Sequence, residues 1–192
     1  MKMTRLETAL VNGDRHSRRV AARMERLLRE ISPRPGARYL EIGSGNGAAA
    51  VRVAQAFGLE VVGVDIDPKQ VERATRASLG VNARFLVADA TRLPFTNGSF
   101  DIVATSKTTH HVPAWHDALE EIARVLTHDG YLVFDDLVLP DWLARAGDLL
   151  APGRAGYLSR RRLDDLLSGD FETIRSESAG IVYQGIFKRI AV

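Results

Sequence analysis

Glycines and an acidic side chain meet where the first long apolar run of the chain ends. The run from Tyr39 carries Glu41 and breaks into a turn that contains Gly43, Gly45 and Gly47. Glycine accepts a positive φ and has no Cβ, so a ligand can lie against the backbone while N–H groups of a following helix point toward it. The pattern predicts a strand, a tight ligand-binding turn and a helix.

Two further acids follow the next two apolar runs. Asp65 ends the second run and Asp89 comes just past the third. A carboxylate has two acceptor oxygens and can bind both hydroxyls of a ribose. The glycine turn also fits the dinucleotide fingerprint, and Asp65 lies at about the right distance for a ribose-binding acid of either kind of nucleotide site.

Together with later segments, these residues resemble the class I S-adenosylmethionine-dependent methyltransferases, in particular the branch that includes the ubiquinone and menaquinone C-methyltransferases. The resemblance covers residues 36 to 136 closely and the remainder loosely. The later segments are Gly63-Val-Asp-Ile-Asp-Pro68, Ala88-Asp-Ala90 with Leu93-Pro-Phe95, Gly98-Ser-Phe-Asp-Ile-Val103, His110-His-Val112 and the stretch from Arg124 to Gly130. It implies an α/β, Rossmann-like, doubly wound fold with a mostly parallel seven-stranded sheet whose last strand is antiparallel.

Two observations favour this family over nicotinamide enzymes. In the family, an acid at the position of Asp89 meets the adenine amino group. Short-chain nicotinamide enzymes need a Tyr-x-x-x-Lys pair, and none of the four tyrosines is followed four places on by lysine.

The resemblance also implies a role for each residue of the cofactor site, with S-adenosyl-L-methionine as cofactor. Asp65 would accept the ribose hydroxyls, Ile66 would pack on adenine and Glu41 would orient the turn. Each acid also has a structural alternative, for example a turn cap at Thr91 for Asp89. The expected cofactor-binding set is Glu41, Gly43, Ser44, Gly45, Gly47, Asp65, Ile66, Asp89, Ala90, Thr105 and Ser106.

The acceptor side offers candidates of several kinds. His110 and His111 follow the fourth apolar run and are the candidate catalytic residues, because histidine can serve as a general base near neutral pH. Lys107 either pairs with an acidic group of the acceptor or is exposed to solvent. Asp135 and Asp136, expected on one face, are candidates to bind an acceptor hydroxyl or amine.

Several chemistries lack their residues. The nucleobase amino-methyltransferase signature Asn/Asp-Pro-Pro-Tyr/Phe does not follow the fourth run, and the absence of cysteine removes covalent cytosine methylation and sulfur-ligated zinc. The expected function is methyl transfer to an O, N or C centre of a small metabolite or quinone-like acceptor. The alternatives are a phospholipid-amine methyltransferase at a membrane surface and a non-catalytic cofactor-binding module.

The apolar periodicity places these residues on an ordered series of elements. Apolar residues from Val20 to Ile31 form one stripe of a helix over about 17–31, and residues before 17 could act as a lid. The expected parallel strands span about 37–42, 60–65, 83–87, 100–105 and 131–135. The expected helices run from Ala48 to Gly58, from Pro68 to Leu79 and through 118–126, with a last helix after Ser159 and an antiparallel pair at 171–178 and 181–190.

Composition sets the outer limits. With 192 residues and 45% hydrophobic content, the chain suits a single domain: a helical cap at 1–35, a cofactor-binding core at 36–136, and an acceptor-side segment with the last strands at 137–192. No apolar stretch approaches a membrane span and no signal segment is evident, so a cytoplasmic location is expected. A net charge of +2 gives no indication of nucleic-acid binding, and neither a metal site nor an oligomeric state is predicted.

Overall fold

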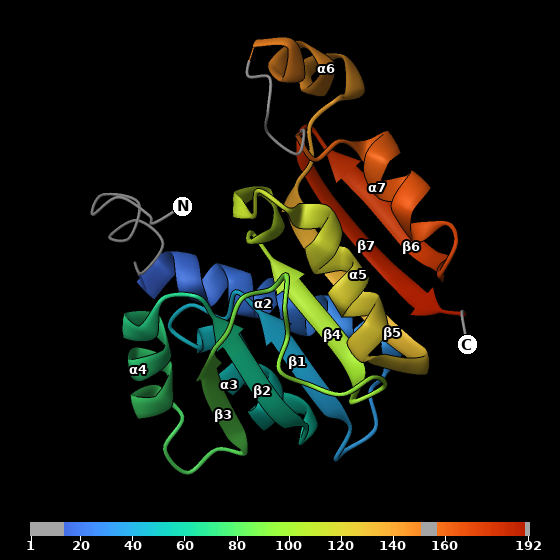
Figure 1. The fold of residues 1–192 in the computed structure, drawn as a ribbon. Coiled ribbons are helices and arrows are strands. Elements are labelled where there is room, and N and C mark those ends of the chain that lie inside the picture. Colours follow the sequence, from blue (N-terminus) through green and yellow to red (C-terminus); the bar gives the residue numbers. More distant parts are fainter. Residues whose placement is uncertain (1–13, 151–156, 191–192) are drawn as a thin grey trace.

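A seven-stranded sheet forms the centre of the protein (Figure 1), in a computed structural model that describes residues 14–150 and 157–190. The strand order is β3-β2-β1-β4-β5-β7-β6, and β7 is antiparallel to both of its neighbours. The remaining pairs are parallel, which confirms the predicted sheet. The strands are β1 Arg38–Ile42, β2 Glu60–Asp65, β3 Ala83–Val87, β4 Phe100–Ser106, β5 Leu126–Leu137, β6 Phe171–Ala179 and β7 Val182–Arg189.

Helices cover both faces of this sheet. One apolar cluster joins α2, α3 and α4 to the sheet, and a second joins α5 and α7 to its other face. Parallel strands need such crossovers, so the apolar runs of β1, β2 and β4 are buried on both sides, whereas the edge strand β3 is mostly exposed. The helices are α2 Asp14–Ile31, α3 Ala48–Phe57, α4 Pro68–Ala77, α5 Trp115–Val125, α6 Asp141–Leu150 and α7 Arg160–Leu167, with a 3-10 turn η1 at Thr109–His111.

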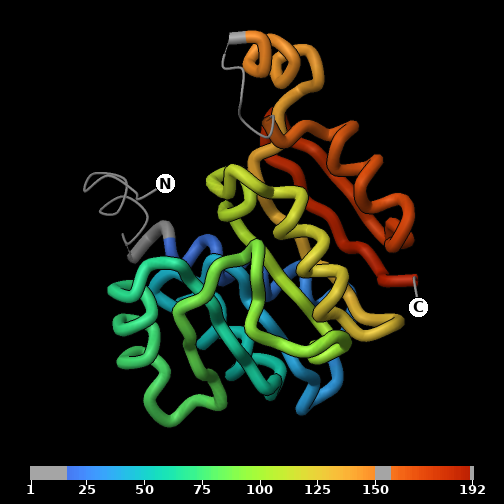
Figure 2. The backbone as a smooth tube through the Cα atoms, viewed as in Figure 1, coloured from blue at the N-terminus to red at the C-terminus, as the bar shows by residue number. Residues whose placement is uncertain are grey.

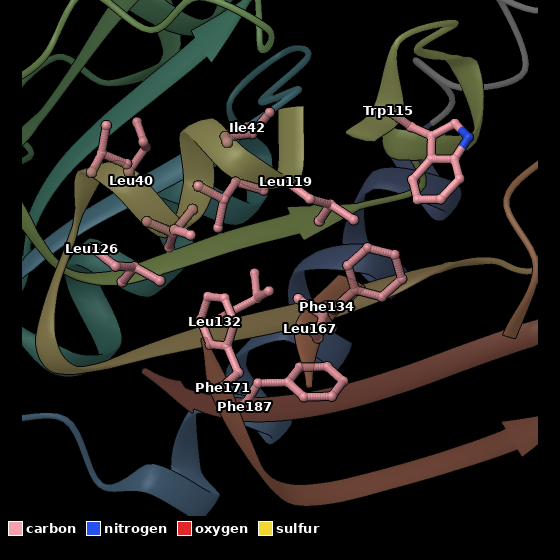
Figure 3. Packing of buried hydrophobic residues seen from close by; sticks show 14 of the residues in the cluster. Leu40, Ile42, Trp115, Leu119, Leu126, Leu132, Phe134, Leu167, Phe171 and Phe187 are labelled. Carbon is pink, nitrogen blue, oxygen red and sulfur yellow. The ribbon is translucent and has the colours of Figure 1, made fainter. Parts of the chain in front are cut away.

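The cluster beneath α5 fixes the strands that end at the candidate site. Figure 3 shows Leu119 of α5 facing the side chains of the sheet, with Trp115 at the end of the cluster near η1. Leu132 and Phe134 alternate with the residues of β5 that face α2. The fixed alternation sends Asp135 and Asp136 to opposite faces, whereas the sequence analysis expected them on the same face.

Local signals placed several element ends correctly. Gly58 ends α3 in the left-handed region at φ 65°, and Asp67 caps α4 by accepting from the Lys69 N–H. Ser159 caps α7 through the Arg162 N–H, as expected. Helix α4, however, ends at Ala77 rather than Leu79.

The boundary between α5 and β5 differs from the prediction. Leu126, assigned to the helix from its spacing, begins β5 and pairs with Phe100 of β4. The strand extends over Leu126–Leu137 rather than 131–135. Its early part includes Asp129 at φ 62°, which an apolar pattern does not reveal.

The expected acceptor-side segment after β5 begins with the helix α6. This helix projects beyond the sheet at the end where β4 terminates (Figures 1 and 2). Trp142 is 72% exposed and Leu149 is 83% exposed, so these two apolar side chains of α6 lie outside the core. Within the described ranges, no helix is long and apolar enough to cross a membrane.

Candidate functional site

The glycine turn is anchored to β2 and lies against the loop that follows β4. The N–H groups of Gly43 and Ser44 both donate to the Val64 carbonyl, at 2.9 and 3.0 Å. Gly43 has φ 69°, and a Cβ there would come within 2.0 Å of the Thr108 hydroxyl. Gly43 is therefore required by a close approach between two loops, one from each expected half of the site.

Gly45 has a different environment. Its φ is 53°, and a Cβ there would meet no atom of the described chain within 4 Å. At Gly47, by contrast, a Cβ would contact Ala74 and Phe85 at 2.8 Å. Gly47 serves packing, whereas Gly45 presents its backbone to open space where a ligand fits.

Asp65 connects the turn to the start of the next helix. Its Oδ2 accepts from the Gly45 N–H and its Oδ1 from the Asp67 N–H, both at 2.9 Å. Burial raises the pKa of this carboxyl, and the two N–H groups oppose the rise. Each oxygen keeps further acceptor capacity, as a pair of ribose hydroxyls requires.

Glu41 lies beneath the turn and is almost completely buried. Burial raises its pKa to about 8, against the lowering effect of the Ala50 N–H, and the charge of Asp65 raises it further. Its Oε2 finds no hydrogen-bond partner within the described residues. A buried polar atom without a partner is costly, so the position suits a bound polar group or an ordered water.

The expected adenine region lies beyond β2 and β3. Ile66 is 68% exposed, as a stacking surface needs. Asp89 Oδ1 accepts from both the N–H and the hydroxyl of Thr91. This oxygen therefore caps the turn at Thr91, which is the structural alternative given above for Asp89. The next residue, Ala90, is partly buried and packs against the cluster beneath α5.

Two expected cofactor residues end β4 with their side chains on opposite faces. Thr105 is fully buried, and its hydroxyl lies 3.3 Å from that of Thr109. Ser106 donates to Asp135 at 2.8 Å. Both side chains are engaged inside the protein, which leaves backbone carbonyls as the groups to offer a ligand.

Asp136 organises the loop that carries the two histidines. This fully buried carboxylate accepts from the N–H groups of Thr108 and Thr109 and contacts His110 Nδ1. Because a carboxylate only accepts, Nδ1 carries the proton and Nε2 becomes the basic nitrogen. His111 is exposed and stacks on His110 with ring centroids 3.9 Å apart.

Asp135 is the centre of a separate polar cluster on the α2 side. It accepts from Arg23, Ser106 and Gln184, and Lys107 Nζ lies 3.4 Å from its Oδ1. Burial pushes its pKa up, but Gln184 and the nearby cations bring it below the ordinary value. Asp135 and Asp136 are filled by internal partners, which contradicts their expected role in binding the acceptor.

Lys107 satisfies neither of its predicted descriptions in full. Its side chain is 22% exposed and is paired with Asp135. The residue also has φ 53°, one of three non-glycine residues with a positive φ in the described chain. Its position directly follows β4, beside the histidine loop.

A second loop-fixing pair was missed by sequence reasoning. Glu121 accepts from the Leu93 N–H at 2.6 Å, and Arg124 donates to the Phe95 and Leu93 carbonyls at 2.7 and 3.1 Å. The two side chains also bond each other. They hold the loop that follows Asp89 against α5, a contact between segments about thirty positions apart.

No group of His, Asp and Glu in the described chain could hold a metal ion.

Comparison with known families identifies the core of the chain. Residues 40–134 match a family described as a methyltransferase domain. The 27-O-demethylrifamycin SV methyltransferase of Amycolatopsis mediterranei is 36% identical over 163 residues, which are 82% of this chain and 52% of that protein. The demethylmenaquinone methyltransferase of Beutenbergia cavernae is 34% identical over 124 residues, 62% of this chain and 50% of that protein. The chain spans about half the length of each of these relatives.

Solved structures share the fold. Geranyl diphosphate methyltransferase in complex with S-adenosylmethionine superposes with a TM-score of 0.74 at 18% identity, over 93% of this chain and 92% of that one. The PH0226 protein of Pyrococcus horikoshii gives a TM-score of 0.74 at 21% identity, over 93% of both chains.

Proposed function

Because the chain belongs to the class I S-adenosylmethionine-dependent methyltransferases, we propose that it transfers a methyl group to an O, N or C centre of a small, metabolite-like or quinone-like molecule. One observation carries this proposal. The glycine turn after β1 contacts the loop after β4, and that loop carries His110 paired with Asp136. Bound S-adenosylmethionine supplies the methyl group as an electrophile on a sulfonium.

The residues of the turn fit that cofactor. The open space at Gly45 offers room for the cofactor, and the two oxygens of Asp65 offer acceptors for a ribose. The unpartnered Oε2 of Glu41 offers a hydrogen-bonding site for a polar group. Asp89 Oδ2 and the exposed face of Ile66 would hold adenine, and the carbonyls of Thr105 and Ser106 would accept from the ammonium. We assign 36–136 to the cofactor and 137–192 to the acceptor side of a single domain.

We assign to His110 the role of the general base that removes a proton from the acceptor. Asp136 holds the Nδ1 proton and fixes the ring, so Nε2 can take a proton from a hydroxyl or amine as methylation proceeds. Methyl transfer needs no covalent nucleophile in the protein, and correct placement of the reactants supplies much of the rate. His111 stacks on the proposed base with its ring 3.9 Å away.

The lipid-surface alternative has less support in the structure. Two arginines of α2 that could meet headgroups are used in part-buried contacts with the sheet: Arg23 with Asp135 and Arg26 with Gln184. The methyltransferase names among the relatives refer to small molecules such as a rifamycin and a demethylmenaquinone. A cytoplasmic location stays a prediction, which fractionation of the producing cells would test.

The test begins with cofactor binding. Calorimetric titration with S-adenosylmethionine, S-adenosylhomocysteine and NADH should show one-to-one binding of the two sulfur nucleotides alone. A panel of hydroxylated and quinol acceptors, followed by S-adenosylhomocysteine formation, then tests turnover. Binding without turnover on any acceptor would favour the non-catalytic module.

Matched variants at the two histidines then test the proposed base. His110→Ala should lower kcat for a hydroxyl acceptor by about 10² to 10⁴ and leave affinity for S-adenosylhomocysteine unchanged. His111→Ala should retain most activity because the proposed base, His110, keeps its contact with Asp136. Equal losses in both variants would contradict the assignment of the base.

A further inference from the structure

The cluster on the α2 side of the sheet edge holds more positive than negative charge. Arg23 and Lys107 both approach Asp135, whose side chain is 1% exposed. The neighbouring acid, Asp136, lies on the opposite face and is filled by its own donors. One carboxylate therefore neutralises only one of the two cations.

Both cations keep unused donors. Arg23 reaches Asp135 with one nitrogen, Nη1, which lies 3.2 Å from each carboxylate oxygen. Its other guanidinium nitrogens make no side-chain hydrogen bond among the described residues. Lys107 contributes one contact of 3.4 Å and has three N–H groups. The side chains are 34% and 22% exposed, which keeps them accessible yet partly shielded from water.

The position of Lys107 places the two cations, Lys107 and Arg23, close in the fold to the loop that carries the proposed base. Lys107 lies between Ser106, which ends β4, and the loop that carries His110. Its backbone is left-handed, with φ 53°, a conformation that a lysine adopts only at a cost. Lys107 directly follows the carboxyl end of β4, three positions before the proposed base.

We propose that Lys107 and Arg23 form an anion subsite that binds a carboxylate of the acceptor. The proposal rests on the function proposed above and narrows it to acceptors that combine a methylated centre with an acidic group. Asp135 positions the two cations and keeps them from repelling each other. The remaining positive charge attracts an anion into a partly buried site, where charge-assisted hydrogen bonds are stronger than in water.

Benzoate and its uncharged isostere benzamide are the probes, titrated into protein saturated with S-adenosylhomocysteine. Benzoate should bind about tenfold more tightly than benzamide. Lys107→Met should abolish this preference, while Lys107→Arg keeps the charge and should retain it. Lys188→Met is the matched control: Lys188 pairs with Asp129 at the opposite edge of the sheet, so its loss changes the net charge equally without touching the subsite.

Two results would overturn the proposal. One is equal affinity for benzoate and benzamide in the parent protein. The other is a loss of S-adenosylhomocysteine affinity in Lys107→Met with benzoate binding unchanged, since the cations would then serve the cofactor's own carboxylate. Failure of S-adenosylhomocysteine to bind the parent would count against the proposed function instead, and the two benzoate titrations can be read without it.

Discussion

At the scale of single residues, Asp65 and Asp67 form a contrasting pair of acids two positions apart. Asp65 bonds the glycine turn, whereas Asp67 caps α4. Asp65→Ala should weaken S-adenosylhomocysteine binding by about 2 to 4 kcal/mol, because two charge-assisted hydrogen bonds to the ribose are lost. Calorimetric titration measures the change.

Asp67→Ala serves as the control for that experiment. It should lower the free energy of unfolding by about 1 kcal/mol through loss of the cap and leave cofactor affinity nearly unchanged. Asp65→Asn preserves the shape of the side chain and separates charge from packing. Unaltered affinity in a folded Asp65→Ala protein would contradict the ribose assignment.

Glu41 should make the stability of the ligand-free protein depend on pH. The folded protein holds this proton up to about pH 8, whereas the unfolded chain loses it near the ordinary value of 4.5. Between these values the unfolded state binds fewer protons, so this group lowers the free energy of unfolding as pH rises. Glu41→Gln should remove that decline.

Urea unfolding of the parent and of Glu41→Gln at pH 6 and pH 9 checks this prediction. The advantage of the variant over the parent should grow with pH. Glu60→Gln, at an exposed position, is the control and should show a constant difference. A constant difference for Glu41→Gln as well would mean that the carboxyl is ionised in both states.

At the scale of elements, α5 acts as a clamp on the loop after Asp89. Arg124→Met removes the donors to the Leu93 and Phe95 carbonyls and should lower the free energy of unfolding by about 2 kcal/mol. Amide hydrogen exchange of residues 93–97 should accelerate more than that of the strands. Urea unfolding and exchange on the same samples measure both effects.

A surface pair provides the comparison for this clamp. Arg76 and Glu72 are four residues apart on α4, and their side chains are 74% and 60% exposed. Arg76→Met should change stability by no more than about 0.5 kcal/mol. Equal losses for the two arginine variants would show that the loop contacts of Arg124 contribute nothing beyond an ordinary ion pair.

Elements whose ends are set by local chemistry could be predicted from the sequence. Gly58 and Ser159 act on groups within four positions of themselves, and each matches its expected place. The start of β5 depends on pairing of Leu126 with Phe100, about twenty-five positions away. Spacing alone cannot separate a helix end from a strand start when both are apolar and buried.

In the candidate site, too, some residues could be predicted from the sequence and others could not. The glycine turn and the acids were visible because their spacing matches a known pattern. The internal partners of Asp135 come from α2, β4 and β7, and sequence distances of up to 112 positions hide them. Which of two adjacent histidines is oriented depends on Asp136, twenty-six positions later. The sequence therefore indicated the candidates, while their partners required the fold.

At the scale of the whole molecule, α2 contributes side chains to the core. Met24, Leu27 and Leu28 are at most 1% exposed and pack in the cluster with α3 and the sheet. Ion pairs such as Glu25 with Arg52 and Glu30 with Arg175 fasten the same helix at its surface. The lid expected before residue 17 lies almost entirely outside the described residues.

Truncation of one α2 leucine should therefore destabilise the whole fold. Leu28→Ala should lower the free energy of unfolding by about 2 to 5 kcal/mol, since a fully buried side chain leaves a cavity between α2 and the sheet. Leu149→Ala on the projecting α6 should stay within about 0.5 kcal/mol, because that side chain is 83% exposed. Leu28→Met keeps the volume and should cost less than about 1.5 kcal/mol. Cooperative urea unfolding measures all three, and a Leu28→Ala loss no larger than that of Leu149→Ala would mean that α2 opens independently of the sheet.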